Sequence, residues 1–129
     1  MKAVISTKDG NNHMRELPEQ AASALHGKRI GDSIKGELID LTGYELQITG
    51  GSTSAGFPLR RDAAGEGLKK IFSVRGIGIQ KVRPGQRVRK TVAGNIIGPT
   101  TAAVNLKVLK EGKAPLAQAE AKDSSAESA

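Results

Sequence analysis

Short apolar or alternating runs recur along the first 110 positions of the chain, separated by turn-forming residues. Each run is bounded by Gly, Pro, Asn or Asp, which is typical of the short strands of a small antiparallel barrel or sandwich. The runs that predict strands are residues 2–7, 34–39, 44–49, 68–75, 77–82, 86–95 and 104–110. Strands and helices do not alternate along the chain, so a mostly β fold is expected.

One segment has the pattern of a helix. In PEQAASALH, residues 18–26, Pro18 suits the first helical turn, Ala and Leu fill the interior, and Gly27 provides a stop. The prediction is therefore a small antiparallel β-barrel-like domain over residues 1–112 with one short helix. Residues 113–129 are rich in Ala, Ser and Glu with little to bury, which predicts a flexible C-terminal tail, either disordered or a frayed helix.

The predicted strand that contains RVRKTV has two different faces. Alternation places Val88 and Val92 on the face that packs on the core. Arg87 and Arg89 then face outward, where a planar guanidinium can bind two phosphate oxygens at once. Lys90 falls on the valine side, so either the strand bulges there or the side chain extends past the rim of the barrel. A Pro-Gly pair just before the strand predicts a turn.

Composition refines this fold. A chain of 129 residues fits one domain, and with three aromatic residues and no Trp its core must be mostly aliphatic. Tyr44 and Phe72 lie in strand patterns, which predicts that both are core residues. Phe57 lies in a predicted loop, which leaves open whether it packs against the barrel or wedges into a partner.

Three features that the sequence lacks exclude several classes of protein. The chain has no Cys, which excludes disulfides and thiolate metal sites. No stretch approaches the roughly 20 consecutive apolar residues that a membrane-spanning helix needs. The first ten residues are too polar for a secretory signal. A soluble cytoplasmic protein is expected, with no membrane partner.

The net charge of +7 is concentrated in the middle of the chain. Residues 50–95 hold ten Lys and Arg against two acids, a net +8, whereas the rest holds ten against eleven. A surface that is merely solvated usually mixes both signs, so the block favours binding to a polyanion. Its cationic residues are Arg60, Arg61, Lys69, Lys70, Arg75, Lys81, Arg83, Arg87, Arg89 and Lys90.

A glycine-rich stretch, ITGGSTSAGFPL, precedes this block at residues 48–59. Its exposed N–H groups and hydroxyls are suited to phosphate or ribose oxygens, although a flexible hairpin connection would have the same composition. A nucleotide-binding P-loop does not fit, because Gly56 leads into Phe57 and Pro58 rather than into Lys and Ser or Thr.

Three stretches carry a family resemblance. ITGGSTSAGFPLR, RVRKTVAGNII and VNLKVLKEG, in this order, closely resemble the sixth eukaryotic-type protein of the small ribosomal subunit, a family shared by archaea and eukaryotes. The resemblance covers roughly residues 1–112. It implies a β-barrel-like domain that binds small-subunit ribosomal RNA beside neighbouring ribosomal proteins, without catalysis or a cofactor. Phosphate, ribose and shape contacts are expected to dominate over sequence readout.

The resemblance also implies which residues face RNA. The positions carried over by motif are Gly50, Gly51, Ser52, Gly56, Phe57, Pro58, Arg60, Arg83, Arg87, Arg89, Lys90 and Asn95. The charge block adds Arg61, Lys69, Lys70, Arg75 and Lys81 as candidates. Ala93 departs from the family pattern, which usually has a cationic residue there. The eukaryotic members end in a long basic helix with a phosphorylated serine cluster, and the acidic tail here gives no ground for expecting that regulation.

Catalytic and metal-binding alternatives have little support in the sequence. His13 and His26, in a predicted turn and at a helix end, lack the regular spacing of metal ligands. Asp62 and Glu66 are surrounded by cationic residues, so they are interpreted as ion-pair partners that shape the basic loop. We therefore predict no enzyme activity, no metal, no cofactor and no small-molecule substrate. The competing hypothesis is a small-barrel translation factor or RNA chaperone that binds RNA transiently.

Overall fold

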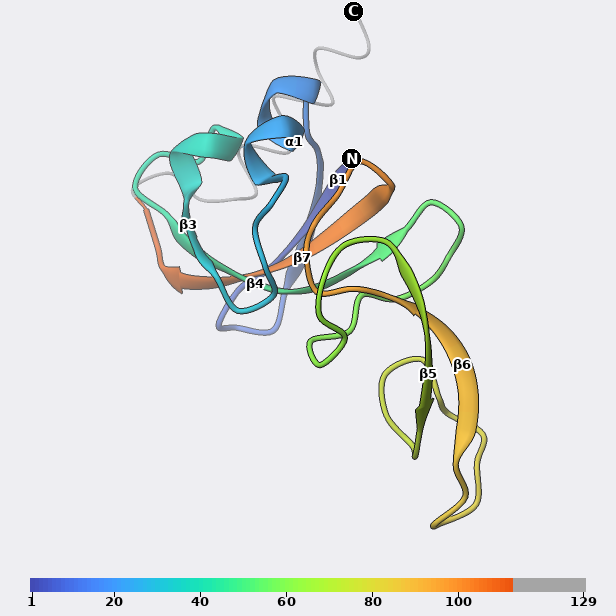
Figure 1. Cartoon of the computed structure of the whole chain (residues 1–129). Helices are drawn as coiled ribbons and strands as arrows, with labels where there is room; N and C mark the ends of the chain where they lie inside the picture. Colours follow the sequence, from blue (N-terminus) through green and yellow to red (C-terminus); the bar gives the residue numbers. More distant parts are fainter. Residues whose placement is uncertain (113–129) are drawn as a thin grey trace, which may run out of the picture.

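Five strands form the main sheet in a computed structural model that describes residues 1–112 (Figure 1). The strand order is β2-β1-β7-β4-β3, and every pair is antiparallel except β1 with β7, which is parallel. The strands are β1 (Lys2–Ser6), β2 (Asn12–Glu16), β3 (Ser33–Lys35), β4 (Glu45–Thr53) and β7 (Thr101–Lys110). The long central pair β4 and β7 therefore organises the sheet.

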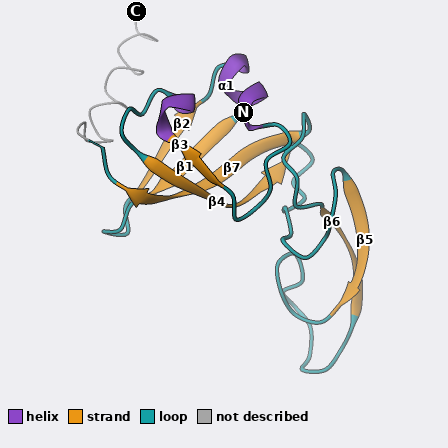
Figure 2. Cartoon of the chain, turned by 60° about the vertical axis from the view of Figure 1, so that its left-hand side comes forward, coloured by secondary structure: helices purple, strands orange, loops and turns teal. Residues whose placement is uncertain are grey.

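Two short helical segments cover one face of this sheet (Figure 2). They are the α-helix α1 (Glu19–Leu25) and the 3-10 helix η1 (Gly36–Ile39). Leu25 from α1 and Ile39 from η1 join one buried cluster with strand residues such as Ile5 and Leu106. Tyr44 is the only aromatic side chain in that cluster among residues 1–112, so the aliphatic core and the burial of Tyr44 are confirmed.

A second, two-stranded sheet projects from one end of the main sheet (Figures 1 and 2). It pairs β5 (Leu68–Ser73) with β6 (Val88–Ala93) in antiparallel register, from Leu68 opposite Ala93 to Ser73 opposite Val88. We call residues 67–95 the arm: it comprises β5, β6 and the connection between them. Where the arm joins the main sheet, the Gly94 N–H donates to the Gly67 carbonyl over 2.9 Å.

The predicted mostly β fold with one short helix is confirmed, although the main sheet is mixed rather than purely antiparallel, because β1 and β7 are parallel. Three segments also differ from the prediction. Residues 77–82 are a loop rather than a strand, because Gly78 turns the chain at φ +84° and lies against Val92 and Pro58. The strand predicted at 34–39 ends after Lys35 and continues as η1. The glycine-rich stretch is β4 as far as Thr53, so the predicted loop is confined to the turn that follows.

The sequence analysis also missed β2 and placed His13 in a turn. This strand forms an edge of the main sheet, and its Met14 side chain is 61% exposed. An edge strand without a buried apolar face lacks the alternation from which strands are recognised. The polar sequence of β2 therefore gave no strand pattern, and the strand is defined only by its pairing with β1.

Candidate nucleic-acid interface

The arm contains eight cationic residues and not one acid. All eight are exposed: Lys69, Lys70, Arg75, Lys81, Arg83, Arg87, Arg89 and Lys90. The arm has no carboxylate of its own that would reduce its positive potential. It also projects beyond the main sheet (Figure 1). A projecting, exclusively positive element is an electrostatic footprint for a polyanion.

The two faces of the arm have different surroundings. Opposed residues of an antiparallel pair share a face, so Phe72 and Arg89 lie together on one side. The register has no irregularity along β6, which excludes the bulge considered for Lys90. Lys90 and Val88 lie on the other side, toward the loop that connects the strands. The predicted alternation of β6 is confirmed.

The burial expected for two of these residues is wrong. Phe72 was expected in the core, yet its side chain is 67% exposed, because no layer covers the outer face of the arm. Val88 is only half-buried, whereas Val92 is fully buried where β6 reaches the main domain. A two-stranded sheet buries little by itself, so strand alternation there does not imply a core.

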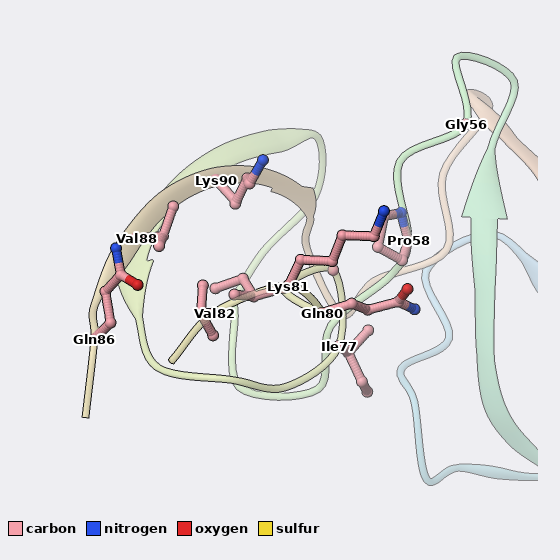
Figure 3. Close-up of a pocket in the computed structure, with 11 residues that line it drawn as sticks. Gly56, Pro58, Ile77, Gln80, Lys81, Val82, Gln86, Val88 and Lys90 are labelled. Carbon is pink, nitrogen blue, oxygen red and sulfur yellow. The ribbon is translucent and has the colours of Figure 1, made fainter. Parts of the chain in front are cut away.

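A groove of about 760 Å³ lies between β6 and the connecting loop (Figure 3). Figure 3 shows the Lys81 side chain extending toward Pro58, with Val88 and Lys90 on the strand across the groove. The lining residues are Gly56, Pro58, Ile77, Gly78, Ile79, Gln80, Lys81, Val82, Gln86, Val88 and Lys90. The groove thus brings the glycine-rich turn and the basic block together. Gln80 and Gln86 were missed as candidates, because an amide gives no charge signal.

Arg60 connects the arm to the main domain. Its side chain is 10% exposed, and its Nε donates to Asp62 Oδ1 over 2.5 Å. Its Nη1 donates to the Ile77 carbonyl over 3.1 Å, and its Nη2 donates to Ser73 Oγ over 3.3 Å. These bonds join the end of β5 to the loop behind it. The arrangement favours a structural role for Arg60 over the RNA contact that the sequence suggested.

The contact with Arg60 also changes the pKa of Asp62. The hydrogen bond from Arg60 lowers the pKa of Asp62 below its ordinary value, and burial acts in the opposite direction. The ion pair expected for Asp62 is therefore confirmed. For Glu66 the pairing stays a prediction. Its carboxylate lies so close to Gly98 that a Cβ there would be 2.2 Å from Glu66 Oε1.

Asn95 holds the segment before β5 in place. Its Oδ1 accepts from the Gly65 N–H over 3.2 Å, and its Nδ2 donates to the Arg61 carbonyl over 3.4 Å. Lys69 donates from Nζ to the Ala64 carbonyl of the same segment. The amide of Asn95 is thus engaged within the protein, while the Arg61 side chain stays exposed.

The glycine-rich candidates are divided between two places. Gly50, Gly51 and Ser52 belong to β4 and do not line the groove, whereas Gly56 and Pro58 do. A Cβ at Gly51 would lie 2.4 Å from the Ala103 carbonyl oxygen, so close strand packing already explains that glycine. Phe57 is half-buried, and its N–H donates to Thr53 Oγ1 over 3.2 Å.

Other kinds of site have no counterpart in the part of the chain that is described. Within residues 1–112, no three His, Cys, Asp or Glu side chains gather closely enough to hold a metal ion. No helix in the same range is long and apolar enough to cross a membrane.

Comparisons with known proteins identify one family. A family model described as ribosomal protein S6e matches residues 1–121. Relatives named small ribosomal subunit protein eS6 come from Thermoplasma acidophilum, at 39% identity over 90% of this chain and 93% of their own, and from Methanococcus maripaludis, at 40% over 89% and 91%. A relative of the same name from Haloquadratum walsbyi is 37% identical over 90% of this chain and 71% of its own.

Proposed function

The chain belongs to the ribosomal protein S6e family, whose members are structural rather than enzymatic, and we propose that it binds small-subunit ribosomal RNA through the arm. The single observation that carries this proposal is that the arm, a projecting element without an acid, has eight exposed cationic residues. A ribosomal component has to neutralise phosphates where RNA strands approach it, and this part of the molecule can do so.

The structure supports different roles for different candidate residues. Those with free, exposed cationic groups are proposed to contact phosphates and riboses: Arg61, Lys70, Arg75, Lys81, Arg83, Arg87, Arg89 and Lys90. Those that are engaged within the protein are proposed to shape the interface: Gly51, Arg60, Lys69 and Asn95. Side chains do not enter the deep major groove of A-form RNA, so we propose recognition of backbone and shape.

The described residues outside 50–95 are proposed to face protein neighbours. Outside residues 50–95 the charges of both signs nearly cancel, which suits contacts with other small-subunit proteins better than contacts with phosphates. A place in the small subunit also implies a cytoplasmic location.

Sedimentation distinguishes a structural component from a transient factor. The tagged full-length chain is expressed in cells of its source, and ribosomal subunits are separated in gradients at low and at high salt. We expect the chain to remain in the small-subunit fraction in both gradients, in a fixed ratio to a core small-subunit protein. Release to the top of the high-salt gradient would instead favour a transient translation factor or RNA chaperone.

A further inference from the structure

Phe72 is an aromatic side chain in an unusual position. It is one of two Phe residues in the chain, and it lies on β5 with 67% of its surface exposed. A single exposed apolar residue is normal, but Leu68 on the same face is also 54% exposed. Two exposed apolar side chains on one strand face, set among polar residues, make that face a candidate interaction site.

The neighbours of Phe72 are cationic. Arg89 lies directly opposite on β6, and side chains of such pairs have Cβ atoms about 5 Å apart. Lys70 precedes Phe72 by two residues on β5, which places it on the same face about 7 Å along the strand. Both cations are exposed. The ring is thus flanked by positive charge along the strand and across it.

We infer that Phe72 is a stacking platform for an unpaired RNA base, with Lys70 and Arg89 binding the adjacent phosphates. This inference rests on the proposed function and specifies its ligand. Every base has a flat face that can stack on an aromatic ring, and aromatic rings interleaved with cations bind unpaired nucleotides. Bases inside an A-form helix have their faces covered, so only a bulged, looped or terminal nucleotide can use Phe72.

Charge favours RNA over a protein as the occupant of this face. The arm offers eight cations and no carboxylate, so a protein partner would have to be strongly acidic around an apolar centre. RNA provides both requirements in one molecule, a flat apolar base and a phosphate on either side of it. The side chain of Phe72 is also free to bind, because the connecting loop packs on the opposite face of the arm.

Two RNA hairpins with the same stem test the inference. One stem is continuous, and the other carries a single bulged fluorescent adenine analogue whose emission is quenched by stacking. The full chain is compared with Phe72→Leu, which keeps an apolar side chain but loses the flat ring, and with Phe72→Trp, which keeps a ring. Leu68→Ala is the matched control, since it shortens another exposed apolar residue on that face.

We expect the unaltered chain to bind the bulged hairpin about fivefold or more tighter than the continuous one and to quench the analogue. Phe72→Leu loses the preference and the quenching but keeps its affinity for the continuous stem. Phe72→Trp and Leu68→Ala keep both.

Three results would overturn the inference. The first is equal affinity of the unaltered chain for the two hairpins, which leaves phosphate binding by the arm intact. The second is a Phe72→Leu protein that keeps the preference for the bulge; if that protein also no longer sediments with small subunits, the ring contacts a protein instead. The third is no binding of the unaltered chain to either hairpin, and only that result also removes the proposed function.

Discussion

Arg60 and Asp62 form an ion pair with 2.5 Å between Nε and Oδ1, at the point where the arm leaves the main domain. The Arg60 side chain is almost covered, whereas that of Asp62 is 66% exposed. A buried guanidinium whose donors reach Ile77 and Ser73 is committed to the protein itself. One cation of the basic block therefore orients the arm, and the exposed cations remain for a ligand.

Arg60→Lys tests this role. Lys keeps the charge but has no planar fork, so the Ile77 carbonyl and the Ser73 hydroxyl lose their common donor. We expect the free energy of unfolding, measured by urea denaturation, to fall by about 1–3 kcal/mol. Arg61→Lys, at an exposed neighbour, should change it by less than about 0.5 kcal/mol. An Arg60→Lys protein of unchanged stability with weakened RNA binding would assign Arg60 to the interface.

Asp62→Asn tests the same ion pair through pH. The pKa of Asp62 is lowered in the folded state by the hydrogen bond from Arg60. Its contribution to stability is therefore present above the unfolded pKa, about 4, and is lost as pH falls through the lower folded pKa. We expect the variant to be slightly less stable at neutral pH, because solvent screens the exposed carboxylate, and to match the unaltered chain in strong acid. Urea denaturation of both proteins at several pH values measures this, and a difference independent of pH would contradict it.

Alternation along the strands predicted much of the fold. The buried positions of β4 and β7 follow from their apolar patterns, because both strands have one face against α1 and η1. The same rule failed for Phe72, because its strand pairs only with β6 and no layer covers its outer face. Alternation shows that two faces exist, and only tertiary packing decides whether either of them is buried.

Two valines on β6 should respond differently to truncation. Val92 is 0% exposed, so Val92→Ala opens a cavity and should lower the free energy of unfolding by about 1–3 kcal/mol. Val88 lies further out on the arm and is half-buried, so Val88→Ala should cost less. Thermal and urea unfolding of both variants provide the comparison. Equal losses would indicate that the whole arm is as tightly packed as the main domain.

Residues 113–129 lie outside the described residues, and their separation from the domain stays a prediction. Because the sequence there offers little apolar surface, we expect a chain truncated after Gly112 to have nearly the same melting temperature. Differential scanning calorimetry of both chains checks this. A decrease of more than about 5 °C, which corresponds to roughly 1 kcal/mol in a domain of this size, would show that the tail packs on the domain.

The sequence predicted where the positive charge of the candidate site lies, but not which of its cations are exposed. The excess of cations over acids singled out residues 50–95 as the candidate binding segment, since charge density depends only on sequence. It could not distinguish Arg60 from Arg61, adjacent residues of which one is buried and the other exposed. That distinction arises from contacts with Ile77 and Ser73, more than ten positions away along the chain.

The exposed cations of the arm are proposed to supply the affinity for RNA. Arg87→Gln combined with Arg89→Gln removes two of them, and Lys8→Gln combined with Lys107→Gln removes the same charge from exposed sites outside the arm. Stability should change little in either double variant, because exposed substitutions usually cost less than about 0.5 kcal/mol each.

Titration of a small-subunit ribosomal RNA fragment at increasing salt concentrations tests this claim most directly. For the unaltered chain we expect the logarithm of the affinity to fall steeply with the logarithm of the salt concentration, with a slope of several negative units. The arm variant should bind more weakly with a shallower slope, while the control variant stays close to the unaltered chain. A slope near zero, or equal losses in the two double variants, would contradict the assignment of the arm as the RNA-binding element.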